Sequence, residues 1–237
     1  MVTGIVVAAG SGKRMNTNIQ KQFLEIHGKP LIYYALKAFE DSRVDQVILV
    51  TGEENVSYCR REIVEKYGFT KVKAVVAGGN ERYHSVYNGL MAADGSDYVL
   101  IHDGARPMVT VEIINNIMVK VQENHACTSG MPVKDTIKFT DADGVVESTP
   151  DRNKMWAVHT PQAFAYSLIR EAHERFRAAG SPAGITDDGM LVEIYMEHPL
   201  KMIHGSYTNM KVTTPDDLPL AELLLSKKVE QSEDGIR

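Results

Sequence analysis

Short apolar runs alternate with amphipathic stretches of helical length along most of the chain. Five runs rich in valine and isoleucine, each bounded by turn residues, predict β-strands at residues 4–8, 46–50, 72–76, 97–101 and 126–133. Between them, apolar residues recur at helical spacing and predict helices at 31–40, 54–67, 81–93 and 111–124. Pro30 suits the first position of one helix and Thr110 the N-cap of another. This alternation predicts an α/β, Rossmann-like fold, in which a mostly parallel sheet carries helices on both faces.

The alternation breaks after residue 133. Lys134 to Phe139 alternates in strand fashion, residues 141–144 form a turn-like Asp-Ala-Asp-Gly sequence, and 145–148 is strand-like again. Too few residues are present for a separate core, so we expect an inserted β-hairpin arm at about 134–156. Further helices are predicted at 164–178, 187–197 and 215–226. We therefore expect a single domain over residues 1–226, followed by a polar, flexible tail at 227–237.

The composition narrows the classes of protein to consider. The chain has 237 residues, of which 43% are hydrophobic and 24% charged, as is typical of a soluble globular protein. No apolar run approaches the roughly 20 residues that span a bilayer, and the first residues read as a core strand without a secretory leader. We therefore expect a cytoplasmic protein. A net charge of −5 argues against a general nucleic-acid or membrane surface, so any anionic ligand must meet a local cluster of cations.

The first predicted strand leads directly into a glycine-rich turn. Residues 4–15 read Gly-Ile-Val-Val-Ala-Ala-Gly-Ser-Gly-Lys-Arg-Met, and Lys21 follows shortly after. Small residues let backbone N–H groups approach a ligand closely, and such donors together with cations suit a triphosphate. The turn is not a Walker loop, because no Gly-Lys-Ser/Thr closes it, and it is not a dinucleotide fingerprint, because position 15 is Met. It favours a bound nucleoside triphosphate, although a plain connecting turn also explains its glycines.

Two further loops are expected to meet this turn, because ligands collect beyond the C-terminal strand ends of parallel sheets. Gly10, Gly79 and Asp103 all lie just past a predicted strand. Asp103 is a candidate Mg²⁺ ligand, since Mg²⁺ needs few protein oxygens when phosphates supply the others. An equal alternative is that Asp103 caps a turn and pairs with Arg106. The Gly79 turn can present a backbone carbonyl to the edge of a base, with Ser85 one helical turn further on, but a plain turn explains this glycine equally well.

Eight motifs occur in an order that is specific to one family. They are Ala-Ala-Gly-Ser-Gly-Lys-Arg-Met at 8–15, Lys-Gln-Phe at 21–23, Gly-Gly-Asn-Glu-Arg-x-x-Ser-Val at 78–86, His-Asp-Gly-Ala-Arg-Pro at 102–107, Pro-Val-Lys-Asp-Thr-Ile-Lys at 132–138, Thr-Pro-Gln-x-Phe at 160–164, Thr-Asp-Asp at 186–188 and Asn-x-Lys-Val-Thr-Thr-Pro-Asp-Asp at 209–217. Each motif alone is weak. Together, over residues 2–226, they resemble the 2-C-methyl-D-erythritol 4-phosphate cytidylyltransferases of the non-mevalonate isoprenoid pathway.

The resemblance implies a homodimeric nucleotidyltransferase that uses CTP, a sugar-alcohol phosphate and Mg²⁺ or another divalent cation. It implies that CTP is held by Ala8, Ala9, Gly10, Ser11, Gly12, Gly79, Asn80 and Ser85. Arg14, Lys21 and Lys211 would be catalytic, and Asp103 would bind the metal. Thr136, Arg152 and Lys211 would hold the sugar phosphate, with Thr136 and Arg152 reaching across from the partner subunit's arm.

Three positions depart from the family pattern. Asn80 stands where aspartate is often found, which leaves the detail of base recognition open, while Gly104 and His159 are peripheral departures. One alternative is a ribitol-5-phosphate cytidylyltransferase, which shares most of the motifs, although a weaker match is expected there at 133–138 and 152–156. Another is a non-catalytic nucleotide-binding regulator, which can dispense with Lys21 and Asp103, although both are present.

Overall fold

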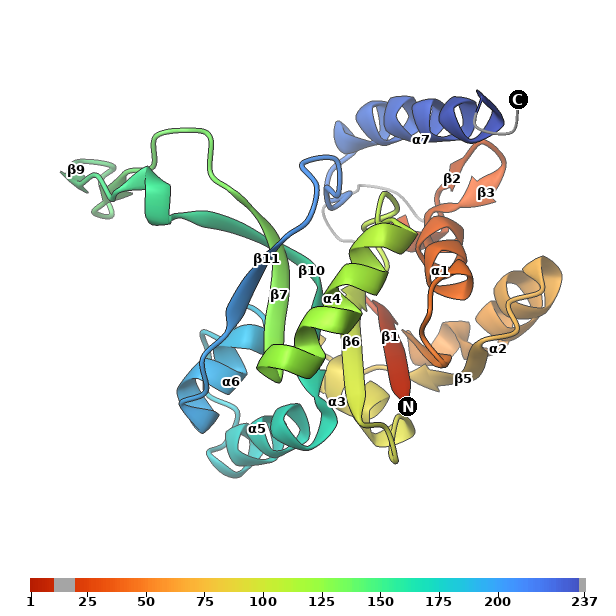
Figure 1. Cartoon of the computed structure of the whole chain (residues 1–237), viewed down its shortest axis with the longest axis horizontal. Helices are drawn as coiled ribbons and strands as arrows, with labels where there is room; N and C mark the ends of the chain where they lie inside the picture. The colour runs from red at the N-terminus through yellow and green to blue at the C-terminus, as the bar shows by residue number, and fades with distance from the viewer. Residues whose placement is uncertain (11–19, 235–237) are drawn as a thin grey trace.

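The computed structural model describes residues 1–10 and 20–234, and it describes side-chain burial up to residue 227. A seven-stranded sheet forms its centre (Figure 1), in the spatial order β11-β7-β10-β6-β1-β4-β5. The strands are β1 (Val2–Ala8), β4 (Gln46–Thr51), β5 (Val72–Ala77), β6 (Tyr98–Asp103), β7 (Ala126–Pro132), β10 (Trp156–Ala165) and β11 (Lys201–His204). All neighbours pair in parallel except β10, which runs antiparallel to β6 and β7. The predicted mostly parallel α/β sheet is confirmed.

Helices cover both faces of the sheet (Figure 1). One face carries α1 (Leu31–Asp41) and α4 (Val111–Asn124), and the other carries α3 (Arg82–Ala92), α5 (Tyr166–Ala178) and α6 (Asp188–Met196). Adjacent residues of β1 show how the sheet separates two cores: Val6 packs with α1 and α4, whereas Ile5 packs with α3 and α5. Successive side chains of a strand point to opposite faces, so a doubly covered strand is apolar throughout.

The predicted elements match the structure closely where the local pattern is strong. The five predicted strands are all present within two residues of their expected ends, and α4 spans the predicted 111–124. The Thr110 side chain accepts a hydrogen bond from the Ile113 N–H at 3.3 Å, which confirms it as the N-cap. Pro30 is the N-cap of α1 and not its first residue. The helix expected at 54–67 is divided into η3 (Glu53–Asn55), α2 (Val56–Tyr58) and a π-helical segment, η4 (Cys59–Glu65).

Two strands of the sheet, β10 and β11, were not predicted. β10 contains Pro161, which is preceded by a cis peptide bond, and its pairing register with β7 shifts between Val158 and Gln162. Proline within a sheet is confined to edges and bulges, so this residue obscured the strand pattern in the sequence. The helix expected from residue 164 begins at Tyr166, where β10 ends.

The segment 134–156, the arm, extends away from the sheet (Figure 1). Its strands β8 (Phe139–Thr140) and β9 (Val146–Ser148) pair antiparallel around a turn in which Gly144 has φ +82°. The prediction of a strand from Lys134 to Phe139 was wrong, because residues 134–138 adopt no strand and only Phe139 and Thr140 pair. A short 3-10 turn, η5 (Arg152–Lys154), follows β9 and leads back toward β10.

The C-terminal helix packs against the segment between β1 and α1. α7 (Asp217–Asp234) packs beside the small hairpin of β2 (Glu25–Ile26) and β3 (Lys29–Pro30), as Figure 1 shows. Ile26, Leu31 and Leu225 belong to a third buried cluster there. α7 thus extends beyond the predicted 215–226 into the segment that we expected to be a tail. Within the described residues, no helix is long and apolar enough to cross a membrane.

Candidate active site

A pocket lies at the C-terminal ends of four parallel strands. Its lining includes Ala8 at the end of β1, Gly52 after β4, Gly78 after β5 and Asp103 at the end of β6. Its volume of about 540 Å³ falls in the range of small-molecule sites. In the sheet, β4 and β5 lie on one side of β1, and β6 lies on the other, so the order of the strands reverses at β1. Open α/β sheets bind ligands at such a topological switch point. The structure therefore confirms that the predicted loops meet.

The pocket collects most of the predicted site residues that the structure describes. Its lining includes Ala8, Ala9, Gly10, Lys21, Gly79, Asn80, Ser85, Asp103 and Lys211. Ser11, Gly12 and Arg14 lie outside the described residues. Thr136 and Arg152 are exposed on the arm and are not part of this lining. Arg152 donates a hydrogen bond to the Lys134 carbonyl within the arm, at 2.8 Å.

Gln22 binds the backbone at the end of β1, a role that we did not predict from the sequence. Its buried side-chain amide donates to the Ala8 carbonyl at 2.7 Å and to the Gln20 side chain at 2.6 Å. Gln22 belongs to the short 3-10 helix η2 (Lys21–Phe23), so these bonds dock η2 against the end of β1. The neighbouring Lys21 consequently borders the pocket.

The second glycine turn is held against the first by close packing. The Gly79 N–H donates to the Ser85 hydroxyl at 3.1 Å, which anchors the turn to α3. A Cβ on Gly78 would lie 2.5 Å from the Ala9 Cβ and 2.6 Å from the Ser85 Oγ. Only glycine permits this approach. Ser85 therefore shapes the turn in addition to lining the pocket.

Asp103 lies between two cations on the floor of the pocket. Its Oδ1 is 3.0 Å from Arg82 Nε, and its Oδ2 is 2.7 Å from Lys211 Nζ. Burial alone would raise the pKa of Asp103, but these two cations outweigh it and hold the pKa far below its usual range. The carboxylate is thus ionised at neutral pH.

The expected partner of Asp103 in the capping alternative was Arg106, and the structure corrects this. The Arg106 N–H donates to the Asp103 carbonyl at 3.0 Å, which closes a turn, but its guanidinium donates to the Asn209 carbonyl at 2.8 Å. The side-chain partners of Asp103 are Arg82 and Lys211. Arg82 stands in the third motif, but nothing in the local sequence showed that α3 would direct it toward β6.

A series of buried hydrogen bonds holds the backbone of Asp103 in place. Burial lowers the pKa of His102 to about 4, so this ring is neutral at pH 7. Its Nε2 lies 3.2 Å from the Arg106 carbonyl, which can only accept, and Nε2 therefore carries the proton. Nδ1 then accepts from the Thr160 hydroxyl at 3.0 Å, and that hydroxyl accepts from the Asp103 N–H at 3.0 Å. The strand end that carries Asp103 is consequently rigid.

The donor set of the pocket fits a hard divalent cation held mainly by a ligand. The described residues contain no group of three or more His, Cys, Asp or Glu side chains that could hold a metal alone. Asp103 nevertheless supplies an ionised carboxylate on the pocket floor. Mg²⁺ commonly takes one or two carboxylates and completes its coordination with substrate phosphates and water.

Comparison with known proteins relates most of the chain to one family. Residues 2–227 match the family model of 2-C-methyl-D-erythritol 4-phosphate cytidylyltransferase. An enzyme of that name from Lachnoclostridium phytofermentans is 50% identical over 224 residues, which cover 94% of this chain and 96% of the relative. One from Lachnospira eligens is 46% identical over 226 residues, covering 95% of this chain and 99% of the relative.

Solved structures agree with the sequence comparison. The crystal structure of 4-diphosphocytidyl-2C-methyl-D-erythritol synthase from Anaerococcus prevotii has a TM-score of 0.83 and 32% identity, covering 95% of this chain and 96% of that one. The 2-C-methyl-D-erythritol 4-phosphate cytidylyltransferase of Thermus thermophilus has a TM-score of 0.74 and 28% identity, covering 94% and 98%.

Proposed function

The chain belongs to the 2-C-methyl-D-erythritol 4-phosphate cytidylyltransferase family, and on that premise we propose that the pocket between β1, β4, β5 and β6 is its active site. The enzyme is a nucleotidyltransferase that joins 2-C-methyl-D-erythritol 4-phosphate to CTP. A phosphate oxygen of the acceptor forms a bond to the α-phosphorus of CTP, the bond from that phosphorus to the β-phosphate oxygen breaks, and pyrophosphate leaves. The observation that supports this site is the meeting of two glycine turns, Lys21, Lys211 and Asp103 in one pocket.

The reaction needs charge stabilisation more than proton transfer. A phosphate dianion is a competent nucleophile near pH 7, since its second pKa is about 6, so no general base is required. The difficulty is that two anions must meet while negative charge builds on the transferring and leaving oxygens. Preorganised cations address this directly, and we assign that work to Arg14, Lys21 and Lys211. This also explains a local group of cations in a chain of net charge −5.

We assign the CTP contacts to the two turns. The residues from Ala8 to Gly12 would offer backbone N–H groups to the phosphates, while Gly79, Asn80 and Ser85 would face the cytosine. The N-terminus of α3 lies in the same lining, where its dipole favours an anion. Mg²⁺ or another divalent cation, held through Asp103, would neutralise charge on the triphosphate.

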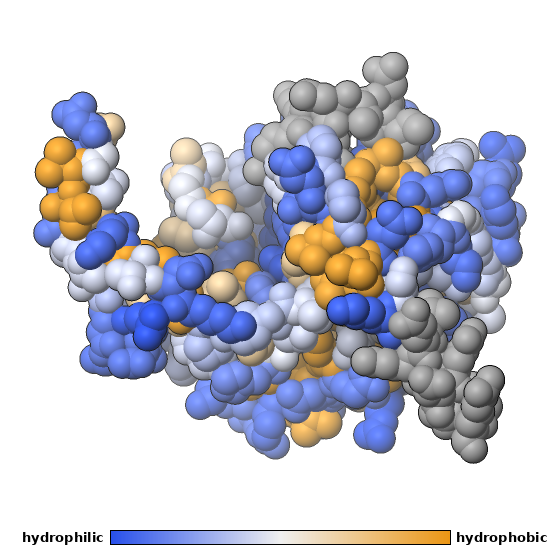
Figure 2. Space-filling model, turned by 90° about the horizontal axis from the view of Figure 1, so that it is seen from above, coloured by the Kyte–Doolittle hydropathy of each residue, from blue (hydrophilic) through white to orange (hydrophobic). Residues whose placement is uncertain are grey.

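We also propose a homodimer in which the arm of each subunit contributes residues to the active site of the other. Phe139, Val145 and Val146 leave 53%, 63% and 53% of their surface exposed, and they form an apolar end on the arm in Figure 2. Such a patch, on a projection too small to fold alone, suits a second copy of the chain. We place Thr136 and Arg152 of each arm at the sugar-phosphate site of the partner subunit, and we propose a cytoplasmic enzyme that binds neither nucleic acid nor membrane.

Substitution of Gly10 by alanine tests the phosphate-binding role of the first turn. Among the residues that the structure describes, a Cβ at this position meets no atom within 4 Å, so their packing does not require glycine there. We expect the melting temperature to stay within about 1 °C while the KM for CTP rises about tenfold or more, because the methyl group displaces the ligand. Thermal melts and initial rates at varied CTP measure both quantities. An unchanged KM would show that this turn does not bind the phosphates of CTP.

CTP is expected to react faster than UTP by about 10²-fold or more in kcat/KM. The N4 amino group of cytosine can donate to backbone carbonyls at Ala8 and Gly79, and the carbonyl of uracil at the same position cannot. Ala8 O retains one acceptor site beside its bond from Gln22. Competition between the two nucleotides at equal concentration, with product analysis by mass, measures the ratio. Similar consumption of both would show that the base pocket is misassigned.

Initial rates of pyrophosphate release separate the candidate functions. With CTP and Mg²⁺, we expect rapid release with 2-C-methyl-D-erythritol 4-phosphate, at least about tenfold slower release with ribitol 5-phosphate, and none without an acceptor. Preference for ribitol 5-phosphate would indicate the related cytidylyltransferase. Binding of CTP without release in any mixture would indicate a regulator.

A further inference from the structure

Asp188 is a buried carboxylate at the start of α6 that the proposed reaction does not use. Its side chain is 1% exposed, and it is not part of the pocket lining. The N-cap of α6 is not Asp188 but the neighbouring Asp187, whose Oδ1 accepts from the Met190 N–H at 2.9 Å. A buried carboxylate is costly unless it is paired, so Asp188 requires another explanation.

That explanation lies in its partner, Arg82. Arg82 Nη1 is 2.7 Å from Asp188 Oδ2, and Arg82 Nε is 3.0 Å from Asp103 Oδ1, so one guanidinium joins two carboxylates. On the other side, His173 Nε2 approaches Asp188 Oδ1 at 3.8 Å. Burial would raise the pKa of Asp188, but Arg82 and His173 outweigh this and lower it, so Asp188 is ionised. Two cations, Arg82 and Lys211, thus face two anions.

We propose that Asp188 is a positioning residue that acts through Arg82 and sets how much negative charge Asp103 retains for a divalent cation. With Asp188 present, the Arg82 charge is shared between two carboxylates. Without it, the full guanidinium charge faces Asp103, which then attracts a metal less strongly. The inference rests on the proposed role of Asp103 as the metal ligand. Mutating a residue that contacts a metal-binding side chain, without binding the metal itself, commonly changes metal affinity by about 10–100-fold.

The test is Mn²⁺ binding to the protein in complex with CTP and without acceptor, measured by electron paramagnetic resonance, because phosphates complete the coordination of a metal held by one carboxylate. Asp103→Asn should remove the part of the Mn²⁺ affinity that the protein adds to that of CTP, which identifies the site. Asp188→Asn keeps the shape of the side chain and removes its charge, and we expect the Mn²⁺ dissociation constant to rise about tenfold. The Mg²⁺ concentration for half-maximal pyrophosphate release should rise by a similar factor, while kcat at saturating Mg²⁺ stays within about threefold. A purely structural residue would lower kcat or the melting temperature without moving the Mn²⁺ constant.

Three further variants make the result decisive. Asp187→Asn removes the same charge from the neighbouring, half-exposed position. Asparagine keeps the cap to the Met190 N–H and loses the hydrogen bond from the Gln162 amide, and the Mn²⁺ constant should stay unchanged. Arg82→Gln alone should lower the melting temperature, because Asp188 stays buried without its partner. Arg82→Gln with Asp188→Asn should recover that loss and bind Mn²⁺ at least as tightly as the wild type. This double variant also carries the test if Asp188→Asn alone does not fold.

Three results would overturn the inference: an Mn²⁺ constant in Asp188→Asn equal to that of the wild type, a double variant that binds as weakly as Asp188→Asn, or a wild-type Mn²⁺ affinity that Asp103→Asn does not weaken. Because Mn²⁺ binding needs no turnover, this outcome is separable from the proposed function. A wild-type protein without pyrophosphate release would refute the proposed reaction and leave the Mn²⁺ comparison intact.

Discussion

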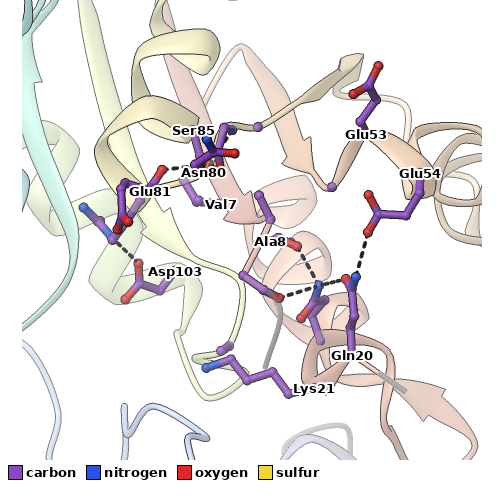
Figure 3. A pocket seen from close by; sticks show the side chains of 18 of the residues that line it. Val7, Ala8, Gln20, Lys21, Glu53, Glu54, Asn80, Glu81, Ser85 and Asp103 are labelled. Atoms are coloured by element: carbon purple, nitrogen blue, oxygen red, sulfur yellow. Dashed lines mark hydrogen bonds and ion pairs between the residues drawn. The ribbon is translucent and has the colours of Figure 1, made fainter. Parts of the chain in front are cut away.

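Replacing Lys21 with alanine is expected to slow pyrophosphate release by about 10²–10³-fold or more while the protein remains folded. Lys21 lies on η2, directly after the first turn, and borders the pocket in Figure 3. We place its ammonium group near the oxygens on which charge builds in the transition state, where water cannot replace it at equal strength. The decrease should therefore appear in kcat and in kcat/KM together. Steady-state rates at saturating Mg²⁺ provide the measurement.

Lys37→Ala is the matched control. It removes the same charge from an exposed position on α1, where Lys37 forms an ion pair with Asp41 one turn away, and pairs of this kind contribute little to stability. Its rate should equal that of the wild type. Near-normal release by Lys21→Ala, with a circular dichroism spectrum like that of the wild type, would exclude Lys21 from catalysis.

Replacing Arg152 with alanine should raise the KM for the sugar phosphate by about tenfold or more and leave the KM for CTP within twofold. An arginine fork suits a phosphate group, and in this chain Arg152 lies exposed on the arm, away from the pocket lining of its own subunit. Lys154→Ala removes a charge from the same short turn and serves as the control. Varying each substrate separately measures the two constants. Equal effects on both substrates would contradict a role specific to the acceptor.

Mixing the Arg152→Ala and Lys21→Ala proteins tests whether the sites are shared. In a mixed dimer, one pocket has Lys21 in its own subunit and Arg152 in the partner's arm, and the other pocket lacks both. Random exchange makes half of the dimers mixed, so at an acceptor concentration well below KM, where Arg152→Ala alone is slow, the rate should return to about a quarter of the wild-type rate. If subunits exchange, as native mass spectrometry can show, and no activity returns, each arm serves its own subunit or none.

The elements that sequence reasoning found are those whose pattern is local. β1 is identified by its continuous apolar run and α4 by apolar residues at helical spacing. β10 and β11 could not be found in this way. Pro161 interrupts the pattern of β10 at its register shift, and β11 spans only Lys201–His204, too short for a period to show.

The active site likewise contains features that the sequence predicts and features that it does not. The glycine turns and Asp103 could be predicted to meet, because strand order in an α/β fold brings strand ends together. The side-chain contacts in the site could not be predicted in this way. Lys211 and Asp103 are 108 residues apart in the chain, and Arg106 and Asn209 are 103 apart. Whether Asp103 would pair with Arg106 or with Arg82 depends on the direction of α3 relative to β6, which no local pattern encodes.

The most direct measurement is ³¹P nuclear magnetic resonance of the protein incubated with CTP, 2-C-methyl-D-erythritol 4-phosphate and Mg²⁺. We expect the three CTP signals and the monophosphate signal to be replaced by two coupled doublets of one diphosphate diester and by a pyrophosphate signal, in equal amounts. Asp103→Asn should show greatly slowed conversion under the same conditions. Unchanged substrates in the wild-type sample, or CDP and inorganic phosphate as the products, would contradict the account.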